Sequence, residues 1–366
     1  MQKVFVVELN HYHTETFAMY KELLPSLINS RDLDIYYYVI PSKVQCLNYA
    51  PHDRIHKITN SAIRYFVSKT GLRSFYFTFQ IKSLIRNHRP DLLIFNTIEP
   101  RRYLKVFRAV DHVKKIGIVH SPFEKGIEHN HDSSKELLFC LNDYNYNYLV
   151  NKIEVDGYFL PMFRNFIFTY KIPQTDKIKI AVQGIINFSK RDYPLLIEIA
   201  KRLNQMKGSP KLVFNIVGNI RFKHGPELNT MIRREGLDNY FILHGPLNDE
   251  EFFKEIYESD FIMPLITRTD SDYFNGRISA SYSLSAAYNK PMIIHSHTAK
   301  SWWVPDDCCI AYTDMEDLLD KFSQISYIKQ AVLLKYEKLI NDKIDKNKIF
   351  LNEISIKYRD FFRTVY

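Results

Sequence analysis

The chain has 366 residues, more than a single hydrophobic core usually serves, so we expect two domains. Hydrophobic residues make up 46% and charged residues 25%, a globular composition that excludes a largely disordered chain. The formal net charge of +9 favours anionic partners such as phosphates or a membrane surface.

The start of the chain and its cysteines bear on the cell compartment. Met1-Gln2-Lys3 leads directly into a strand pattern, and no apolar run reaches the roughly 18 residues of a membrane span. The cysteines at positions 46, 140, 308 and 309 have no CxxC or zinc-ligand spacing, and the adjacent Cys308 and Cys309 are poor partners for a normal disulfide. We interpret all four as reduced thiols. We therefore expect a cytoplasmic protein that neither is secreted nor spans a membrane.

Short apolar strands alternate with helices through the first half of the chain. Strands are predicted at residues 3–9, 34–40, 91–96 and 115–120, and helices at 16–28 and 60–89. Such alternation implies parallel strands joined by helices that cover both faces of a sheet. We expect residues 1–165 to form a Rossmann-like domain.

The second half repeats this alternation. Strands are predicted at residues 178–184, 211–218, 240–245, 260–265 and 291–295, and helices at 193–206, 227–235 and 249–259. A segment with Pro161 and Pro173 separates the halves. We expect a second Rossmann-like domain at residues 175–345, followed by a C-terminal helix at 346–366 that packs back on the first domain.

Five segments of the second half resemble, in order and spacing, the C-terminal domain of GT-B-fold glycosyltransferases. They are Gln183-Gly184 with Lys190-Arg191, Asn215-Ile216-Val217-Gly218, Leu243-His244-Gly245, Ser259 to Leu265, and Asn275 to Pro291. The resemblance implies an α/β fold of two facing Rossmann-like domains with parallel sheets, and a nucleotide-sugar held between them. It assigns donor binding to Gly184, Lys190, Arg191, Gly218, His244, Gly245, Asn275, Arg277, Ser279, Ala280 and Ser281.

The segment that begins at Ser279 also has the physical properties of a phosphate site. Ser279 is a suitable N-cap for a helix through residues 280–284, and the free backbone N–H groups at such a helix start attract anions. Lys190, Arg191 and Arg277 would neutralise the remaining charge of a diphosphate. The alternative is an ordinary capped helix with solvated surface charges.

The chain departs from the GT-B pattern at one position pair. Many retaining members carry two glutamates eight residues apart, and alignment on Pro291 places Gly276 and Leu284 there. The contacts these glutamates make with ribose or sugar hydroxyls then fall to other groups, such as Asn275, Ser281 or Ser285, or are absent. The stereochemistry of transfer stays open.

Candidate catalytic groups follow the predicted strands of the first half, because ligands bind at the carboxyl ends of parallel strands. These candidates are Glu8, His13, Glu99, His120 and Glu124. His120 ranks first, since many GT-B members place a histidine after a comparable strand, where imidazole contacts the sugar or accepts a proton. A hydrogen-bonded structural histidine is the alternative. A general base is needed only if the sugar's configuration inverts.

Neither a metal nor a cofactor is predicted. The histidines at positions 11, 13, 129 and 131 resemble metal ligands, but a fourth ligand at diagnostic spacing is missing. GT-B relatives usually stabilise the leaving diphosphate with helix ends and basic side chains instead. The nucleotide-sugar would thus be a substrate, and the site would be metal-independent.

The predicted helix at residues 60–89 is rich in basic and aromatic residues. Such a segment suits an anionic membrane surface, where it would present the cleft to a lipid-linked acceptor. In that case the protein would be peripheral on the inner membrane face. The alternative is a core helix with a solvated basic face.

The sequence as a whole predicts a hexosyltransferase-type glycosyltransferase of polysaccharide biosynthesis. It would transfer a sugar from a nucleotide diphosphate sugar to a lipid-linked or cell-surface glycan. Two alternatives are a sugar-nucleotide epimerase of the same fold and an inactive subunit that binds a glycan or nucleotide. Nucleic acid is not an expected partner, because the basic residues are dispersed and no recognition motif is present.

Overall fold

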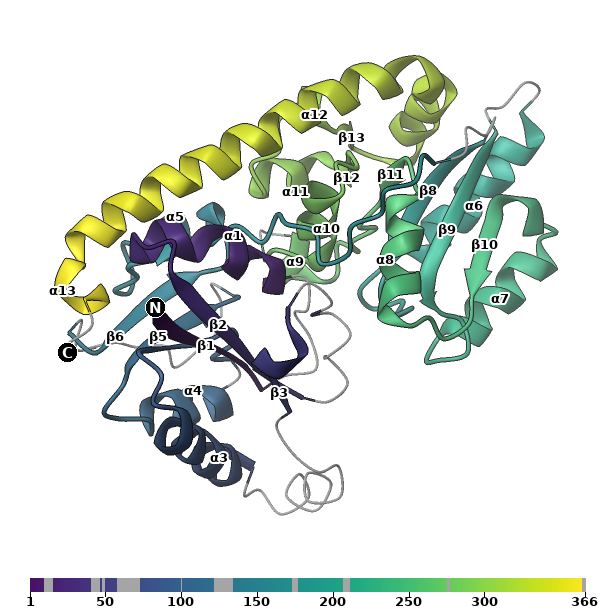
Figure 1. The fold of residues 1–366 in the computed structure, drawn as a ribbon. Helices are drawn as coiled ribbons and strands as arrows, with labels where there is room; N and C mark the ends of the chain where they lie inside the picture. The colour runs from purple at the N-terminus through teal and green to yellow at the C-terminus, as the bar shows by residue number, and fades with distance from the viewer. Residues whose placement is uncertain are drawn as a thin grey trace. The chain divides into compact units, whose positions relative to one another are not determined.

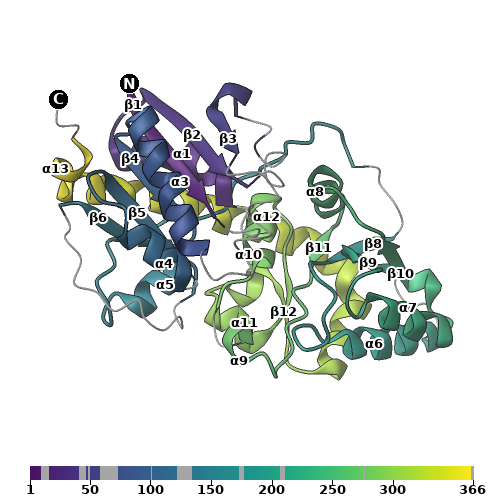
Figure 2. The same ribbon diagram turned by 90° about the horizontal axis from the view of Figure 1, so that it is seen from below.

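The computed structural model describes residues 1–9, 16–40, 47, 50–57, 73–99, 101–121, 134–172, 177–206, 211–274 and 277–363. The chain forms two compact units. Unit 1 comprises Met1–Asn165 and Ile344–Tyr366, and unit 2 comprises Phe166–Lys343. The boundaries expected from the sequence, at 165, 175 and 345, lie close to these limits. Figures 1 and 2 show both units, each of which is described by itself below.

Unit 1 is built on a parallel sheet of seven strands in the order β3-β2-β1-β4-β5-β6-β7. The strands are β1 (Gln2–Glu8), β2 (Leu33–Val39), β3 (Ile55–Lys57), β4 (Leu92–Phe95), β5 (Lys114–Val119), β6 (Glu136–Cys140) and β7 (Gly157–Tyr158). The helices are α1 (Phe17–Ile28), α3 (Arg73–His88), α4 (Arg101–Arg108), α5 (Asp143–Leu149) and α13 (Arg359–Phe362). This strand order is that of the Rossmann fold.

The sheet of unit 1 buries both of its faces. Along β1, Val4 and Val6 pack with α1 and the C-terminal segment of the chain, whereas Phe5 and Val7 pack with α3 and α4. All four side chains are at most 1% exposed. A strand buried on both faces has a continuous apolar sequence, which is why the pattern at 3–9 was recognisable.

The predicted helix at 60–89 is described from residue 73 onward. It ends at His88, and Arg89 then takes a positive φ of 48° before Pro90. Residues 58–72 lie outside the described part of the chain.

Unit 2 contains a parallel four-stranded sheet in the order β10-β9-β8-β11 and a parallel pair, β12-β13. The strands are β8 (Ile178–Gln183), β9 (Leu212–Asn219), β10 (Phe241–His244), β11 (Phe261–Ile262), β12 (Ile293–His295) and β13 (Ile310–Tyr312). The helices are α6 (Tyr193–Gln205), α7 (Gly225–Arg234), α8 (Asp249–Tyr257), α9 (Ser271–Phe274), α10 (Ala280–Ala287), α11 (Ser296–Ser301) and α12 (Met315–Lys357), whose residues from Ile344 onward belong to unit 1. A bridge between Ile262 and Met292 joins the sheet to the pair.

Alternate side chains of β8 face different layers of unit 2. Ile180 and Val182 pack with α6, α7 and the first turns of α12, and Ala181 packs with α8 and α10. Gln183 lies two residues after Ala181 on the same strand, so its side chain points to the same face, which α8 and α10 cover. The strand order reverses between β8 and β11, and such a reversal is where open parallel sheets bind ligands.

Candidate functional site

The carboxyl ends of β1 and β4 in unit 1 form a buried polar cluster around Glu8. Glu8 is 0% exposed, and its Oε2 accepts hydrogen bonds from Asn96 Nδ2 at 2.5 Å and Thr97 Oγ1 at 2.8 Å. Asn96 Oδ1 in turn accepts from Tyr20 at 2.5 Å and Thr16 at 2.8 Å. Burial, and after it the charge of Glu8, raises the pKa of Tyr20, so this phenol stays a donor.

His120 follows β5 and joins this cluster. Its Nε2 lies 2.6 Å from the carbonyl oxygen of Asn96 and 3.4 Å from Thr97 Oγ1. Because a carbonyl only accepts, Nε2 carries a proton in this arrangement. Asn145 Nδ2 donates to the His120 carbonyl at 3.0 Å, which fixes the backbone of the histidine.

The other sequence-predicted catalytic residues are only partly placed. Glu99 is 7% exposed, and its Oε1 accepts a hydrogen bond from the backbone N–H of Ser121 at 3.1 Å. His13 and Glu124 lie outside the described residues. Glu8, Asn96, Thr97 and His120 are therefore the residues that the structure brings together at this edge. Sequence reasoning missed Thr16 and Tyr20, because neither belongs to a recognisable motif. Thr16 immediately precedes α1, and Tyr20 lies within it.

In unit 2, two glycines allow the ends of β8 and β9 to approach each other. Gly184 has a φ of +106°, and a Cβ there would lie 2.9 Å from Arg191 Nη2. A Cβ on Gly218 would lie 2.2 Å from the Gly184 carbonyl oxygen. Neither position tolerates a side chain, because the first needs a left-handed backbone and the second meets the main chain.

The guanidinium of Arg191 occupies the space next to Gly184. Its Nη1 donates to the carbonyl oxygen of Pro264, which follows β11, so the side chain crosses the point where the strand order reverses. Burial lowers the pKa of Arg191, and the charges that act on it come from Tyr193 and Tyr273. Among the described residues no carboxylate lies within 4.0 Å of this guanidinium.

Two further basic residues converge on the ring of Tyr273 in α9. Lys190 Nζ lies 5.7 Å from the ring centroid, and the guanidinium carbon of Arg277 lies 5.1 Å from it. Both are within the range of a cation–π contact. Arg277 Nη1 is also 4.0 Å from Asp272 Oδ2. Two cations from separate loops are thus held around a single aromatic ring.

The start of α10 has the cap that the sequence predicted. Ser279 has an extended backbone, with φ −99° and ψ 155°, and its Oγ accepts from the backbone N–H of Ser281 at 3.0 Å. Ser281 Oγ accepts from Ser279 Oγ at 2.9 Å and from Gln183 Nε2 at 2.6 Å. Ala280 is exposed, so the helix start is open to solvent. Asn275 lies outside the described residues.

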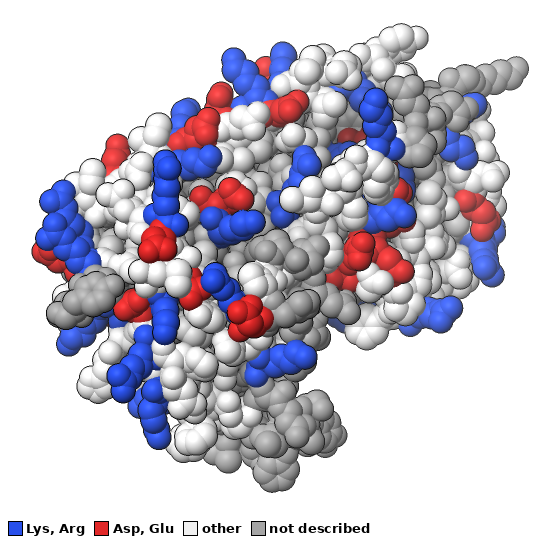
Figure 3. Space-filling model, in the orientation of Figure 1, with Lys and Arg blue, Asp and Glu red and all other residues white. Residues whose placement is uncertain are grey.

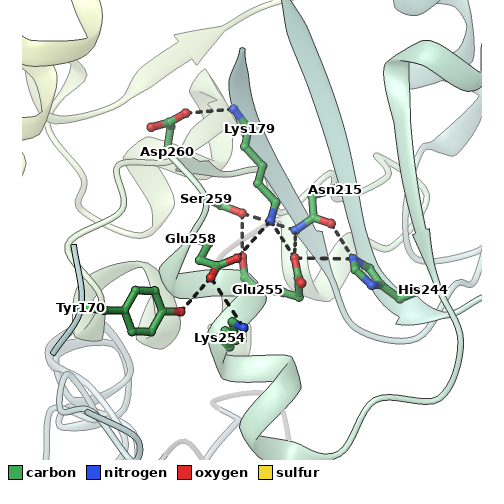
Figure 4. Close-up of polar contacts among 9 residues, drawn as sticks. All are labelled: Tyr170, Lys179, Asn215, His244, Lys254, Glu255, Glu258, Ser259 and Asp260. Atoms are coloured by element: carbon green, nitrogen blue, oxygen red, sulfur yellow. Dashed lines mark hydrogen bonds and ion pairs between the residues drawn. The ribbon is translucent and has the colours of Figure 1, made fainter. Parts of the chain in front are cut away.

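His244 lies at the end of β10 in a polar cluster covered by α8 (Figure 4). Its Nε2 is 2.7 Å from Asn215 Oδ1 and 3.6 Å from Glu255 Oε2, and Lys179 Nζ is 2.7 Å from that same carboxylate oxygen. Burial lowers the pKa of His244, although the charge of Glu255 opposes the shift, so the imidazole is neutral at pH 7. The next residue, Gly245, has open space where a Cβ would stand.

The described residues contain no group of three or more His, Cys, Asp or Glu side chains arranged to hold a metal ion. The histidines at positions 11, 13, 129 and 131 lie outside the described residues, so the metal-independent site stays a prediction. Within the described part of the chain, no helix is long and apolar enough to cross a bilayer.

Comparison with known proteins identifies the fold. Neither a protein-family model nor a curated protein sequence matches the chain. Solved structures do match. A glycosyltransferase from Rickettsia africae ESF-5 is 13% identical over 99% of both chains, with a TM-score of 0.63. A UDP-N-acetylglucosamine 2-epimerase is 13% identical over 98% of this chain and 97% of its own, with a TM-score of 0.58.

A third match is the lipopolysaccharide outer core galactosyltransferase WaaB. It is 13% identical over 96% of this chain and 99% of its own, with a TM-score of 0.51. The chain therefore has the α/β GT-B fold, with open parallel sheets, as the resemblance of its second half implied. Transferases and epimerases both occur among the proteins that share this fold.

Proposed function

We propose that the protein is a glycosyltransferase that transfers a sugar from a nucleoside diphosphate sugar to an acceptor. The observation that carries the proposal is Arg191, a partly buried cation without a carboxylate partner among the described residues, at the strand reversal of unit 2. A cation withdrawn from water needs an anion to compensate it. The fold supports the diphosphate of a nucleotide-sugar as that anion.

In this proposal unit 2 binds the donor through its diphosphate. The open start of α10 offers backbone N–H groups, and Lys190, Arg191 and Arg277 supply positive charge. These groups would stabilise the charge that develops on the leaving diphosphate without a metal or cofactor. Gly184 and Gly218 let the main chain come close to the phosphates, and His244 and Gly245 would lie toward the nucleoside.

Unit 1 binds the acceptor in this proposal, and His120 is its first candidate for a catalytic role. Glu8 orients Asn96 and Thr97, since both of them donate to its carboxylate. His120 would contact the transferred sugar or accept the acceptor's proton if the configuration inverts. If the configuration is retained, the leaving diphosphate would assist the acceptor. Catalytic roles for His13, Glu99 and Glu124 remain predictions.

Two other functions fit the same fold. An epimerase is favoured by the similarity to the UDP-N-acetylglucosamine 2-epimerase, which also covers nearly the whole chain. An inactive subunit that binds a glycan or nucleotide is favoured by Gly276 and Leu284, which stand where many retaining transferases have glutamates. The products formed from a nucleotide-sugar separate these functions from the transferase.

Thermal unfolding with a panel of UDP, GDP, ADP and CMP sugars and their free nucleotides tests the proposal. A ligand that binds only the folded state raises its stability by about 2.7 kcal/mol at a concentration 100 times its Kd. We expect one nucleotide class to raise the Tm. Slow hydrolysis of that donor without acceptor supports the transferase, and interconversion of two sugars supports the epimerase. No stabilisation at millimolar concentration contradicts a nucleotide-sugar site.

We also infer that unit 1 docks on the inner face of an anionic membrane, where a lipid-linked or cell-surface glycan of polysaccharide biosynthesis would be the acceptor. Phe75 and Phe79 lie one turn apart on α3 and are 74% and 60% exposed. Lys82 and Arg86 continue the same exposed face, and neither α3 nor α4 contains an acidic residue. Figure 3 shows blue and white atoms at the end of unit 1 where Figure 1 places these helices.

Vesicle binding tests this membrane surface. The double variant Phe75→Ser and Phe79→Ser is expected to lose at least about tenfold in affinity for phosphatidylglycerol vesicles, because two inserted aromatic side chains are removed. Tyr327→Ser is the control, since Tyr327 is 87% exposed on α12, far from α3 in sequence. Equal binding by wild type to neutral phosphatidylcholine vesicles, or equal loss in both variants, contradicts the proposal.

A further inference from the structure

Gln183 is a buried amide at the proposed donor site that the sequence did not assign to any role. It is the last residue of β8 and is 2% exposed. Its Nε2 donates to Ser281 Oγ at 2.6 Å, in the first turn of α10. Its Oε1 is buried and has no hydrogen-bond partner among the described residues.

The neighbouring hydroxyls bond to each other and to the nitrogen of this amide. Ser281 Oγ accepts from Gln183 Nε2 and from Ser279 Oγ, which uses both lone pairs of that hydroxyl. Ser279 Oγ is itself occupied by the backbone N–H of Ser281. Protein interiors rarely leave a buried acceptor unsatisfied, because its hydrogen bond to water is lost without replacement.

The location of this acceptor indicates what would satisfy it. Gln183 ends β8, one of the two inner strands, at the carboxyl edge of the sheet, beside the start of α10, whose N–H groups favour phosphate. Arg191 packs against the next residue, Gly184. An acceptor next to these anion-binding groups suits a phosphate ester whose organic part carries a hydroxyl group.

We propose that Gln183 Oε1 accepts a hydrogen bond from a hydroxyl of the donor, either on its ribose or on the sugar to be transferred. The inference rests on the proposed function and names the group that recognises donor hydroxyls in a chain with Gly276 and Leu284 in place of two glutamates. A neutral amide replaces carboxylates in this role. The positive charge of Arg191, Lys190 and Arg277 is then left for the phosphates.

Binding by Gln183→Met tests the inference, because Met has a similar length and cannot accept this bond. The probes are inorganic pyrophosphate, the nucleoside diphosphate and the nucleoside diphosphate sugar of the class that stabilises wild type. We expect about a tenfold weaker Kd for hydroxyl-bearing ligands and an unchanged Kd for pyrophosphate. Loss with both nucleotides assigns the ribose hydroxyl, and loss with the nucleotide-sugar alone assigns the transferred sugar.

Two outcomes with Gln183→Met overturn the inference. An unchanged Kd for all ligands shows that the amide makes no contact, and an equal loss that includes pyrophosphate shows a structural role. Ser281→Ala removes the hydroxyl that holds the amide of Gln183 and leaves Gln183 itself unchanged. This variant should weaken the Kd for the same ligands by a smaller factor. A weaker Kd for pyrophosphate alone contradicts the inference. If the wild-type protein binds no nucleotide, the proposed function is wrong, and the inference about Gln183 is wrong as well.

Discussion

Replacing Arg191 with Ala is expected to weaken binding of the stabilising nucleotide about 100-fold or more. Hydrogen bonds to charged groups contribute about 1.5–3 kcal/mol each, and two such bonds to a diphosphate correspond to at least two factors of ten. Arg191 is partly buried before any ligand binds, so binding desolvates it less than it would a fully exposed side chain. Titration calorimetry with the nucleotide found in the thermal panel measures the loss.

Two further variants show whether the effect belongs to the guanidinium. Arg191→Lys keeps the charge but loses the fork that binds two phosphate oxygens, so an intermediate affinity is expected. Arg233→Ala removes an exposed arginine from the last turn of α7 and should leave the Kd unchanged. Because Arg191 also bonds to the carbonyl of Pro264, the Tm without ligand is compared as well. A folded Arg191→Ala protein that binds the nucleotide with the wild-type Kd would contradict the proposed donor site.

Leu351→Ala is expected to destabilise unit 1 by about 2–5 kcal/mol, the usual range for a fully buried leucine. Leu351 lies near the end of α12, is 0% exposed, and belongs to the core that also contains Val4 and Val6 of β1. That loss is a large share of the about 5–15 kcal/mol that stabilises a typical domain. The last 23 residues of the chain thus support the first strand.

Separate probes for the two units test this dependence. Both tryptophans of the chain, Trp302 and Trp303, lie in unit 2, so their fluorescence in urea follows unit 2. Hydrogen exchange of the β1 peptide follows unit 1. Leu351→Ala should accelerate exchange in β1 and leave the tryptophan transition in place. Ile356→Ala, at a position of α12 that is 63% exposed, should change neither, and an effect of equal size there would contradict the core assignment.

The alternation of strands and helices could be predicted from the sequence because buried parallel strands have continuous apolar runs. The strands β1, β8 and β9 are six to eight residues long, and each contains three or four consecutive apolar residues. Strands of two or three residues, such as β7 and β13, are too short for any periodicity. Such short strands form because neighbouring strands in the sheet pair with them, and their own sequence does not predict them.

The candidate sites were predictable as positions along the chain but not as contacts. The cap at Ser279 is local, and the structure confirms it. The pairing of Gln183 with Ser281 joins residues 98 apart, and that of Glu8 with Asn96 joins residues 88 apart. No pattern in a single sequence connects such partners, because register and packing bring them together. For the same reason the partly buried state of Arg191 could not be foreseen from its place in a loop.

The division of the chain into units has a consequence for its synthesis. Unit 2 is one continuous stretch and is complete when Lys343 has been added, whereas unit 1 also needs residues of its core as late as Phe362. About 200 residues separate the end of the first segment of unit 1 from that phenylalanine, which takes about 10–40 s at the usual pace of a ribosome. Through that interval the apolar strands made first lack the C-terminal residues that complete their core.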